Sequence, residues 1–390
     1  MLLAFIVLYL IGTLLIGYWA SRRVKNTTDF VVAGRKLPLV VAGSALFATW
    51  FGSETVMGAP AEFVDGGLLG VMEDPFGAAL CLFLAGALIA KPLYRLKILT
   101  FNDFYRIRFG RATEMLSAFF MVPSYLGWIA AQMVAMAIVL NVLVGMSIFW
   151  GVMLTLVVVV AYTYIGGMWA VSVTDFVQTI MIIIGVIALA ISVGSQAGGV
   201  EAVVAAQPEG FWNFFPERNL DAWVHYLAAW MTIGLGSIPQ QDVFQRLMSG
   251  KDERTAARSG YLGGAMYLTI GFIPLFIGLC AKMLHPELLQ DDPQKMLPLM
   301  TLKYGSLLIQ ILFFGALLSA ILSTTSGAIL APATVVGENL VKPLFKKLTD
   351  KQLLLTMRLA VILIALIAAW MAMSGESIYD LVGQSSALSL

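Results

Sequence analysis

Charged side chains are scarce in this sequence. Asp, Glu, Lys and Arg make up 12% of its 390 residues, whereas hydrophobic residues make up 59%. A soluble domain of this length carries roughly twice that share of charge. The composition therefore excludes an ordinary water-soluble protein. The net charge of +1 says nothing about nucleic acid, because the charges are segregated by loop, and we expect no nucleic-acid partner.

Cysteine and histidine are also rare, with two of each. Cys81 and Cys280 both lie in apolar runs, so they indicate small core residues rather than a disulfide framework or a zinc site. His225 and His285 are far apart and near the ends of apolar segments, which favours interfacial positions. The sequence has no paired His motif for a metal, no Gly-x-Ser-x-Gly and no Walker-type glycine loop, so an enzyme is disfavoured.

Long apolar runs dominate instead, and about 20 such residues are enough to cross a bilayer. We predict eleven membrane spans, at 2–20, 37–64, 67–93, 115–144, 147–165, 173–195, 223–247, 259–284, 304–336, 353–373 and from 378 onward. The first span has no basic residues before it, so we expect a retained helix rather than a cleaved signal. The last is still apolar at Leu390, so we expect a chain truncated within it.

The basic residues predict the orientation of these spans. Of the 24 lysines and arginines, 20 fall in or beside the loops after spans one, three, seven and nine, all on one side of the membrane. By the positive-inside rule that side is cytoplasmic and the N-terminus is outside, in what we expect to be the plasma (inner) membrane. The longest loop on the opposite side, 196–222, is rich in aromatics and is expected to lie in the interface or to cover a vestibule.

Two spans are interrupted. Span two contains Ala48-Thr-Trp-Phe-Gly-Ser-Glu-Thr55, in which Gly52-Ser53 weakens the helix beside the carboxylate of Glu54. A charge or a broken helix at membrane depth marks a functional site that faces protein or a water-filled cavity. Span seven is interrupted at 234–242. Each break lies in the first helix of a five-span set, and such paired breaks in inverted halves point to a transporter's binding site.

The pattern predicts an all-α polytopic membrane protein forming one transport domain over 1–390. It comprises an extra helix at 1–20, a first repeat at 37–195 and an incomplete second repeat at 223–390. Span nine adds a cluster of hydroxyls, from Ser319 to Ser326, that offers oxygen ligands to a small cation. The alternatives are hydroxyls that bond back to their own helix and small residues that let helices pack closely.

Several motifs at consistent spacing resemble the sodium:solute symporter family, with its LeuT-type fold of five-plus-five inverted repeats. They are Asp29-Phe-Val-Val-Ala-Gly34-Arg35, the broken stretch Ala48-Thr-Trp-Phe-Gly-Ser-Glu, the run from Tyr164-Ile-Gly166-Gly167 to Asp175-Phe-Val-Gln178, and Ser319-Ala320-Ile-Leu-Ser323-Thr324. Together they cover residues 29 to 324.

The resemblance implies a sodium ion as the coupling ion and no organic cofactor. It implies sodium ligands at the carbonyls of Ala48, Phe51 and Ala320 and the hydroxyls of Ser323 and Thr324. It also places Asp175 near the inner sodium exit. From the sequence alone, Asp175 is equally well interpreted as a capping carboxylate at the start of span six.

The resemblance places the substrate beside the sodium, between the broken helices. The candidate substrate-binding residues are Trp50, Ser53, Glu54 and Thr55 on span two, Trp128 and Gln132 on one face of span four, and Gln240 on span seven. Another charged run, Glu73-Asp74-Pro75, lies near the outer end of span three.

Trp50, Trp128 and the outline of 238–246 resemble the family's choline-transporter branch, but Gln240 and Glu54 depart from it. Because aromatic faces and a buried carboxylate attract cations, we expect a small amine, an amino acid or a related zwitterion. The alternatives are tryptophans that only pack and a Glu54 that is a structural acid.

The sequence thus predicts sodium-coupled symport of a small organic solute into the cell by alternating access. Its partners are that solute and the lipid bilayer, and nothing implies an obligate oligomer. Two alternatives stay open. Protons could replace sodium, with Glu54 as their carrier, or the chain could be the transporter-like input module of a membrane sensor.

Overall fold

The computed structural model describes residues 2–291, 293–345, 347–374, 378, 381, 382 and 385. Their secondary structure is helical, apart from one isolated parallel bridge between Leu37 and Gly250. The α-helices are α1 (Leu2–Ser21), α2 (Thr27–Val32), α3 (Leu39–Trp50), α4 (Ala59–Gly66), α5 (Ala78–Leu84), α6 (Ala90–Leu96), α7 (Phe101–Phe109), α8 (Arg111–Ser124), α9 (Leu126–Val144), α10 (Ile148–Gln196), α11 (Gly199–Ala205), α12 (Leu220–Gly234), α13 (Gln241–Met248), α14 (Glu253–Ile270), α15 (Phe272–Leu284), α16 (Leu288–Asp291), α17 (Met296–Tyr304), α18 (Leu307–Val335), α19 (Lys342–Leu344) and α20 (Asp350–Ala372).

The helices follow the predicted spans as far as the described residues reach. Among those residues, six helical stretches are long and apolar enough to cross a membrane: Glu54–Leu96, Arg111–Val144, Thr163–Gln196, Glu253–Leu284, Leu307–Leu344 and Asp350–Ala372. Shorter apolar helices include Leu39–Trp50 and Ile148–Ala161. The predicted last span lies mostly outside the described residues.

The predicted boundary between spans five and six coincides with a break in α10. This element, Ile148–Gln196, consists of two helices that meet at Gly167, whose angles of φ 49° and ψ −154° are not helical, so the loop predicted at 166–172 is reduced to this break. A Cβ at this position would lie 2.5 Å from the ring of Phe30, and a positive φ is itself unfavourable for other residues. Asp175 lies about two turns after this break, inside the second of the two helices, so its interpretation as a cap at the start of span six is wrong.

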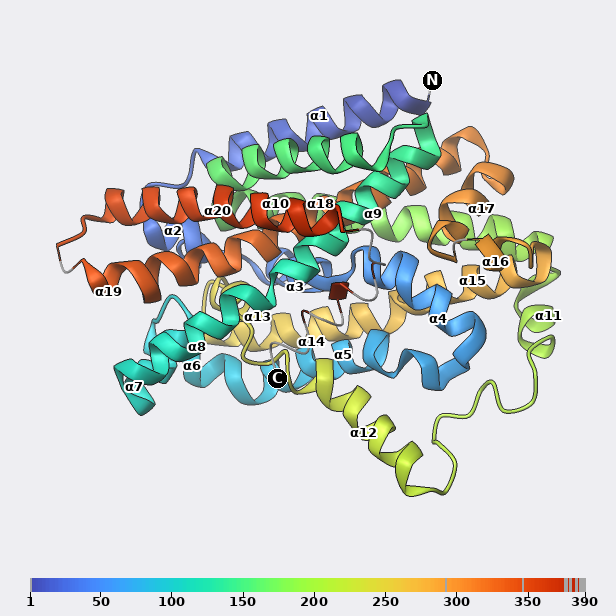
Figure 1. The fold of residues 1–390 in the computed structure, drawn as a ribbon, viewed down its shortest axis with the longest axis horizontal. Coiled ribbons are helices and arrows are strands. Elements are labelled where there is room, and N and C mark those ends of the chain that lie inside the picture. Colours follow the sequence, from blue (N-terminus) through green and yellow to red (C-terminus); the bar gives the residue numbers. More distant parts are fainter. Residues whose placement is uncertain are drawn as a thin grey trace.

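Two long helices form the centre of the bundle. The helices α10 and α18 pack along each other, α1 lies against α10, and α3 packs against α10, α14 and α18 (Figure 1). The middle of α18 is buried continuously from Phe313 to Val335 and is rich in Ala, Ser, Thr and Gly. Such small residues allow close helix contact in a membrane, where apolar surface alone does not distinguish protein from lipid. The packing therefore places the predicted cation-binding residues of α18 deep inside the protein.

The two ends of the bundle differ. The helices α7 and α19, and the chain between α1 and α2, lie at one end, whereas α11 and the loop after it lie at the other (Figure 1). At the first end the loops are fixed by helix caps, including reciprocal Thr100–Asp103 and Thr349–Gln352 capping boxes. Several of the basic residues used to predict the orientation lie at this end, including Arg106 and Arg108 of α7 and Lys342 of α19.

At the opposite end, the aromatic loop folds back onto α4. The backbone N–H of Leu68 donates to the carbonyl of Phe211 at 3.1 Å, and the Phe211 ring packs edge-on against Phe63 at 5.1 Å. Lys282 of α15 donates to the carbonyl of Val64, near the end of α4, and lies 5.9 Å from the Phe211 ring. The loop, α4 and α15 are thus fastened together, while neighbouring Trp212 remains exposed.

Candidate functional site

The break in span two occurs where the sequence predicted it. The helix α3 ends at Trp50, Phe51 has a non-helical ψ of 70°, and the N–H of Gly52 donates to the carbonyl of Trp50 at 2.6 Å. Gly52 therefore does not donate to Ala48, its partner in a regular helix. The freed carbonyl of Ala48 accepts a hydrogen bond from the Thr324 hydroxyl of α18 at 3.3 Å. The broken helix and α18 thus meet through oxygen atoms that a small cation can bind.

The neighbouring helix α9 stabilises the other side of this break. The side-chain oxygen of Gln132 accepts a hydrogen bond from the N–H of Ser53 at 3.1 Å. A Cβ on Gly52 would lie 2.7 Å from the Thr324 hydroxyl and 2.8 Å from the Gln132 oxygen. The glycine therefore allows three helices to converge at one point, where any side chain larger than hydrogen would clash.

The structure also brings Ser323 next to Asp175. The Ser323 hydroxyl donates to one carboxylate oxygen of Asp175, and both residues are fully buried. Ala320 lies one turn before Thr324 and is equally buried. Four of the five predicted sodium-binding residues, Ala48, Ala320, Ser323 and Thr324, thus lie where α3 meets α18, and the fifth, Phe51, lies at the break itself.

Arg246 of α13 extends this buried group. Its guanidinium lies 3.6 Å from the second carboxylate oxygen of Asp175, and the two side chains are 1% and 0% exposed. A Cβ on Gly327 of α18 would lie 2.2 Å from a guanidinium nitrogen, so a glycine is needed where Arg246 packs against α18. An unpaired charge at this depth is costly, which makes Arg246 the natural counter-ion of Asp175.

The polar contacts continue from Arg246 to the break in span seven. Arg246 donates to the carbonyl of Asp242 at 3.4 Å, and the Asp242 carboxylate accepts a hydrogen bond from the Tyr125 hydroxyl at 2.5 Å. The helix α12 ends at Gly234, and α13 starts at Gln241 after Pro239, a residue without a backbone N–H. A chain of contacts therefore connects the predicted cation site with Tyr125, next to the second break.

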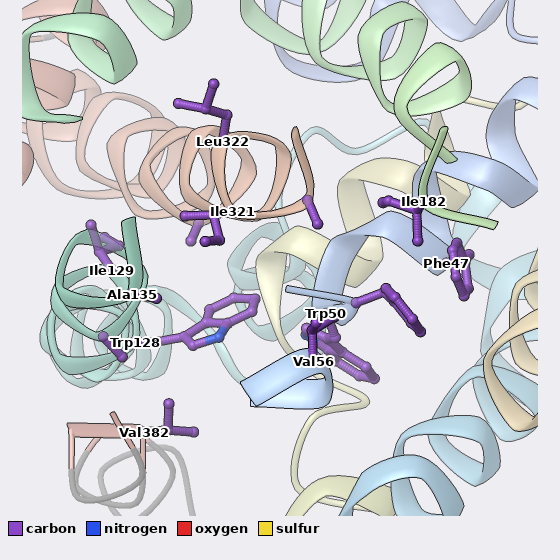
Figure 2. Close-up of a cluster of buried hydrophobic side chains, with 14 of the residues drawn as sticks. Phe47, Trp50, Val56, Trp128, Ile129, Ala135, Ile182, Ile321, Leu322 and Val382 are labelled. Carbon is purple, nitrogen blue, oxygen red and sulfur yellow. The ribbon is translucent and has the colours of Figure 1, made fainter. Parts of the chain in front are cut away.

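A cavity lies between the two breaks. It holds about 480 Å³, counting space open to solvent, and is lined by Trp50, Glu54, Asp74, Ala78, Ser124, Tyr125, Trp128, Ile233, Ser237, Gln240, Tyr267, Val382 and Ser385. The Trp128 ring extends from α9 toward Trp50 and Val56 at the broken helix, with Val382 on its other side (Figure 2).

Of the predicted substrate-binding residues, Trp50, Glu54, Trp128 and Gln240 line this cavity. The other three are placed differently. Gln132 binds the backbone at the break, Ser53 is fully buried beside it, and the Thr55 hydroxyl donates to Asp74 at 2.6 Å. They support the walls of the site rather than line the cavity.

Sequence reasoning noted the run that contains Asp74 without naming Asp74 as a substrate-binding residue, and it gave no role to Tyr125 and Tyr267. Asp74 had a signal, since a carboxylate in an apolar span is unusual. The two tyrosines had none, because a tyrosine in a membrane helix commonly only packs or anchors. Asp74 lies at a break in span three, because its own backbone angles, φ −137° and ψ 116°, are not helical.

A second, larger hollow adjoins the cavity. It holds about 1100 Å³, again counting open space, and shares Glu54 and Asp74 with the cavity. Its other walls come from the first half of α4, the stretch 69–73 and the α12 region, including Glu62, Glu73, His225 and Tyr226. The hollow therefore leads from the cavity toward the end of the bundle that carries the 196–222 loop.

Comparison with known proteins agrees with this architecture. The model of the sodium:solute symporter family matches residues 30–388. The chain belongs to the sodium:solute symporter family. It is 27% identical over 400 residues to a high-affinity choline transporter of Drosophila melanogaster, covering 98% of this chain and 64% of that relative. It is 31% identical over 383 residues to a high-affinity proline transporter of Bacillus subtilis, covering 92% of this chain and 78% of the relative.

Solved structures confirm the predicted fold class of this symporter family member. A Na⁺-coupled sialic acid symporter in a substrate-bound outward-open state superposes with a TM-score of 0.82 at 20% identity, over 99% of this chain and 85% of that one. A nucleobase-cation-symport-1 family transporter superposes with a TM-score of 0.66 at 15% identity, over 93% of this chain and 78% of that one. The chain is therefore an integral membrane protein with the LeuT-like fold.

Proposed function

We propose that this chain carries out sodium-coupled symport of a small organic solute by alternating access. The contact between the Thr324 hydroxyl and the freed carbonyl of Ala48 supports this proposal most directly. Hydroxyl and carbonyl oxygens suit a small hard cation, and discontinuous transporter helices supply such carbonyls. We assign the sodium ligands to the carbonyls of Ala48, Phe51 and Ala320 and the hydroxyls of Ser323 and Thr324.

Sodium at this place bridges the broken helix and α18. By holding the break in its present form, it stabilises the walls that Trp50 and Glu54 contribute to the solute cavity. Linkage then requires each ligand to raise the affinity for the other by the same factor. This reciprocal coupling allows a sodium gradient to drive solute uptake.

The sidedness of the structure supports inward transport. We propose that the basic end of the bundle is cytoplasmic in the plasma (inner) membrane, with the N-terminus outside. The larger hollow beside Glu54 then lies on the outer side of the bundle, where solute and sodium would enter. A negative-inside potential adds about 2.3 kcal/mol per charge per 100 mV to inward movement of sodium.

The test uses the double variant S323A/T324A in proteoliposomes, with solute uptake measured against a sodium gradient. A matched control is S259A/T155A, because these buried hydroxyls donate back to carbonyls of their own helices at 2.8 and 2.7 Å. We expect the site variant to lose its sodium dependence and the control to keep it. An unchanged sodium dependence in S323A/T324A would exclude the assignment.

Proton coupling is the second candidate, because Glu54 borders both the cavity and the outer hollow. A carboxylate at such a junction can exchange a proton with the outside and still face the solute. Uptake that needs a pH gradient but no sodium, and that is lost in Glu54→Gln, would favour this candidate over the first.

A further inference from the structure

The carboxylate of Asp74 has one oxygen that is bonded and one that is free. Its Oδ2 accepts hydrogen bonds from the hydroxyls of Thr55 and Tyr267, at 2.6 and 2.9 Å. Asp74 is only 6% exposed, and its buried Oδ1 has no hydrogen-bond partner among the described residues. Buried acceptors are nearly always bonded in folded proteins, so an unmet acceptor on a residue that lines a cavity points to a donor from a ligand.

The rest of the cavity carries a second acidic side chain and aromatic surface. Glu54 supplies a second carboxylate, and Trp50, Trp128, Tyr125 and Tyr267 supply aromatic rings. The described residues that line the cavity include no lysine or arginine, and the sequence from 359 to 390 contains none either. A solute carboxylate would therefore meet two carboxylates and no basic side chain, whereas a cation would meet charges and aromatic faces that attract it.

We propose that the solute is a protonated amine that carries at least one N–H and no carboxylate, with its ammonium group held between Asp74 Oδ1 and Glu54. This proposal rests on the transport function proposed above and narrows it to one substrate class. An ammonium N–H gives Asp74 Oδ1 the donor it lacks, in a charge-assisted hydrogen bond. A quaternary ammonium has no N–H, so it would leave this oxygen unmet while excluding water from it.

This chemistry distinguishes the chain from the named relatives. Choline is quaternary and proline is a zwitterion, and neither matches a cavity with two carboxylates and an unmet acceptor. A site built to hydrogen-bond an N–H rejects an analogue without it far more strongly than a purely apolar site does. We therefore expect selectivity to depend on the number of N–H groups rather than on size alone.

The experiment measures binding to the full chain in lipid nanodiscs containing sodium, by calorimetry or thermal shift. The probes are ethanolamine, N-methylethanolamine, N,N-dimethylethanolamine and choline, which share one skeleton and differ stepwise in N–H groups, together with proline and glycine betaine. We expect the three amines with an N–H to bind about ten- to a hundredfold more tightly than choline, from the usual strength of a charged hydrogen bond. Proline and glycine betaine should not bind measurably.

Three results would overturn the proposal. These are choline binding as tightly as N,N-dimethylethanolamine, a zwitterion binding more tightly than the amines, and no binding of any amine in the millimolar range. The series is decided on the unmodified chain, so it does not depend on a variant that folds.

The variant Asp74→Asn tests the residue itself. We expect it to lose about tenfold or more in affinity for N,N-dimethylethanolamine but much less for choline. Glu201→Gln, at a surface position on α11, should leave both affinities unchanged. Stabilisation by sodium alone should persist in Asp74→Asn, because the predicted sodium ligands are elsewhere.

The response to sodium distinguishes a failure of this proposal from a failure of the proposed transport function. If sodium stabilisation disappears in Asp74→Asn but survives in S323A/T324A, Asp74 binds the metal ion and the amine assignment is wrong. If amine selectivity holds but uptake is independent of sodium, the symport function is wrong and the substrate class stands.

Discussion

Replacing Arg246 with methionine removes the cation that faces Asp175 and keeps a side chain of comparable length. Both residues are buried, at 1% and 0% exposure, and their charged atoms are 3.6 Å apart. Removing one partner of such a pair costs about 3–5 kcal/mol, because the other charge is left uncompensated. The free energy of unfolding in detergent micelles, measured by denaturant titration, should fall by this amount in Arg246→Met.

The same pair provides its own controls. Replacing both charges, in D175N/R246M, should recover much of the loss, since two neutral groups leave no unpaired charge. Gly327→Ala should destabilise the original chain, in which the new Cβ would lie 2.2 Å from the guanidinium. The same change should be better tolerated in the R246M background, because the flexible methionine side chain can move aside. A loss below about 1 kcal/mol in Arg246→Met would refute the reasoning, because that is the range of exposed pairs.

Two further substitutions test the breaks and kinks of the helices. Gly52→Ala places a Cβ 2.7 Å from the Thr324 hydroxyl, so stabilisation by sodium in a thermal-shift assay should weaken markedly; an unchanged sodium response would contradict the convergence of helices at this point. Gly167→Ala places a Cβ 2.5 Å from the Phe30 ring at a residue with a positive φ. This change should destabilise the fold by about 1–3 kcal/mol and lower the yield of folded protein. The control Gly12→Ala, with no atom within 4 Å of the new Cβ, should leave the yield unchanged.

The sequence predicted the helical spans and both broken helices, because apolar length and helix breakers are local signals. It predicted the break at Gly166-Gly167 but not its short length, because only the tertiary contact with Phe30 shows how a single glycine joins the two helices of α10. Family resemblance supplied the cation-site residues, and the structure then brought Ala48 and Thr324 into contact.

The lining of the cavity was harder to predict than the contact between α3 and α18. Trp50, Glu54, Trp128 and Gln240 were named from motifs and line it, but Tyr267 and Asp74 meet only in the folded chain, where they are hydrogen-bonded across 193 positions of sequence. No local pattern specifies such a pair. Likewise, Thr55 looked like a solute ligand, yet its hydroxyl serves to orient Asp74.

The attachment of the aromatic loop to α4 has a mechanical consequence. The hydrogen bond between Leu68 and Phe211, and the Lys282 contact with the end of α4, tie the second half of the broken helix to the loop beside the hollow. A tilt of α4 therefore cannot occur alone, because it must carry the loop and strain the link to α15. A displacement of the chain beside Glu54 is therefore coupled to a displacement of the loop at the mouth of the hollow. Access to the hollow should change together with the shape of the site.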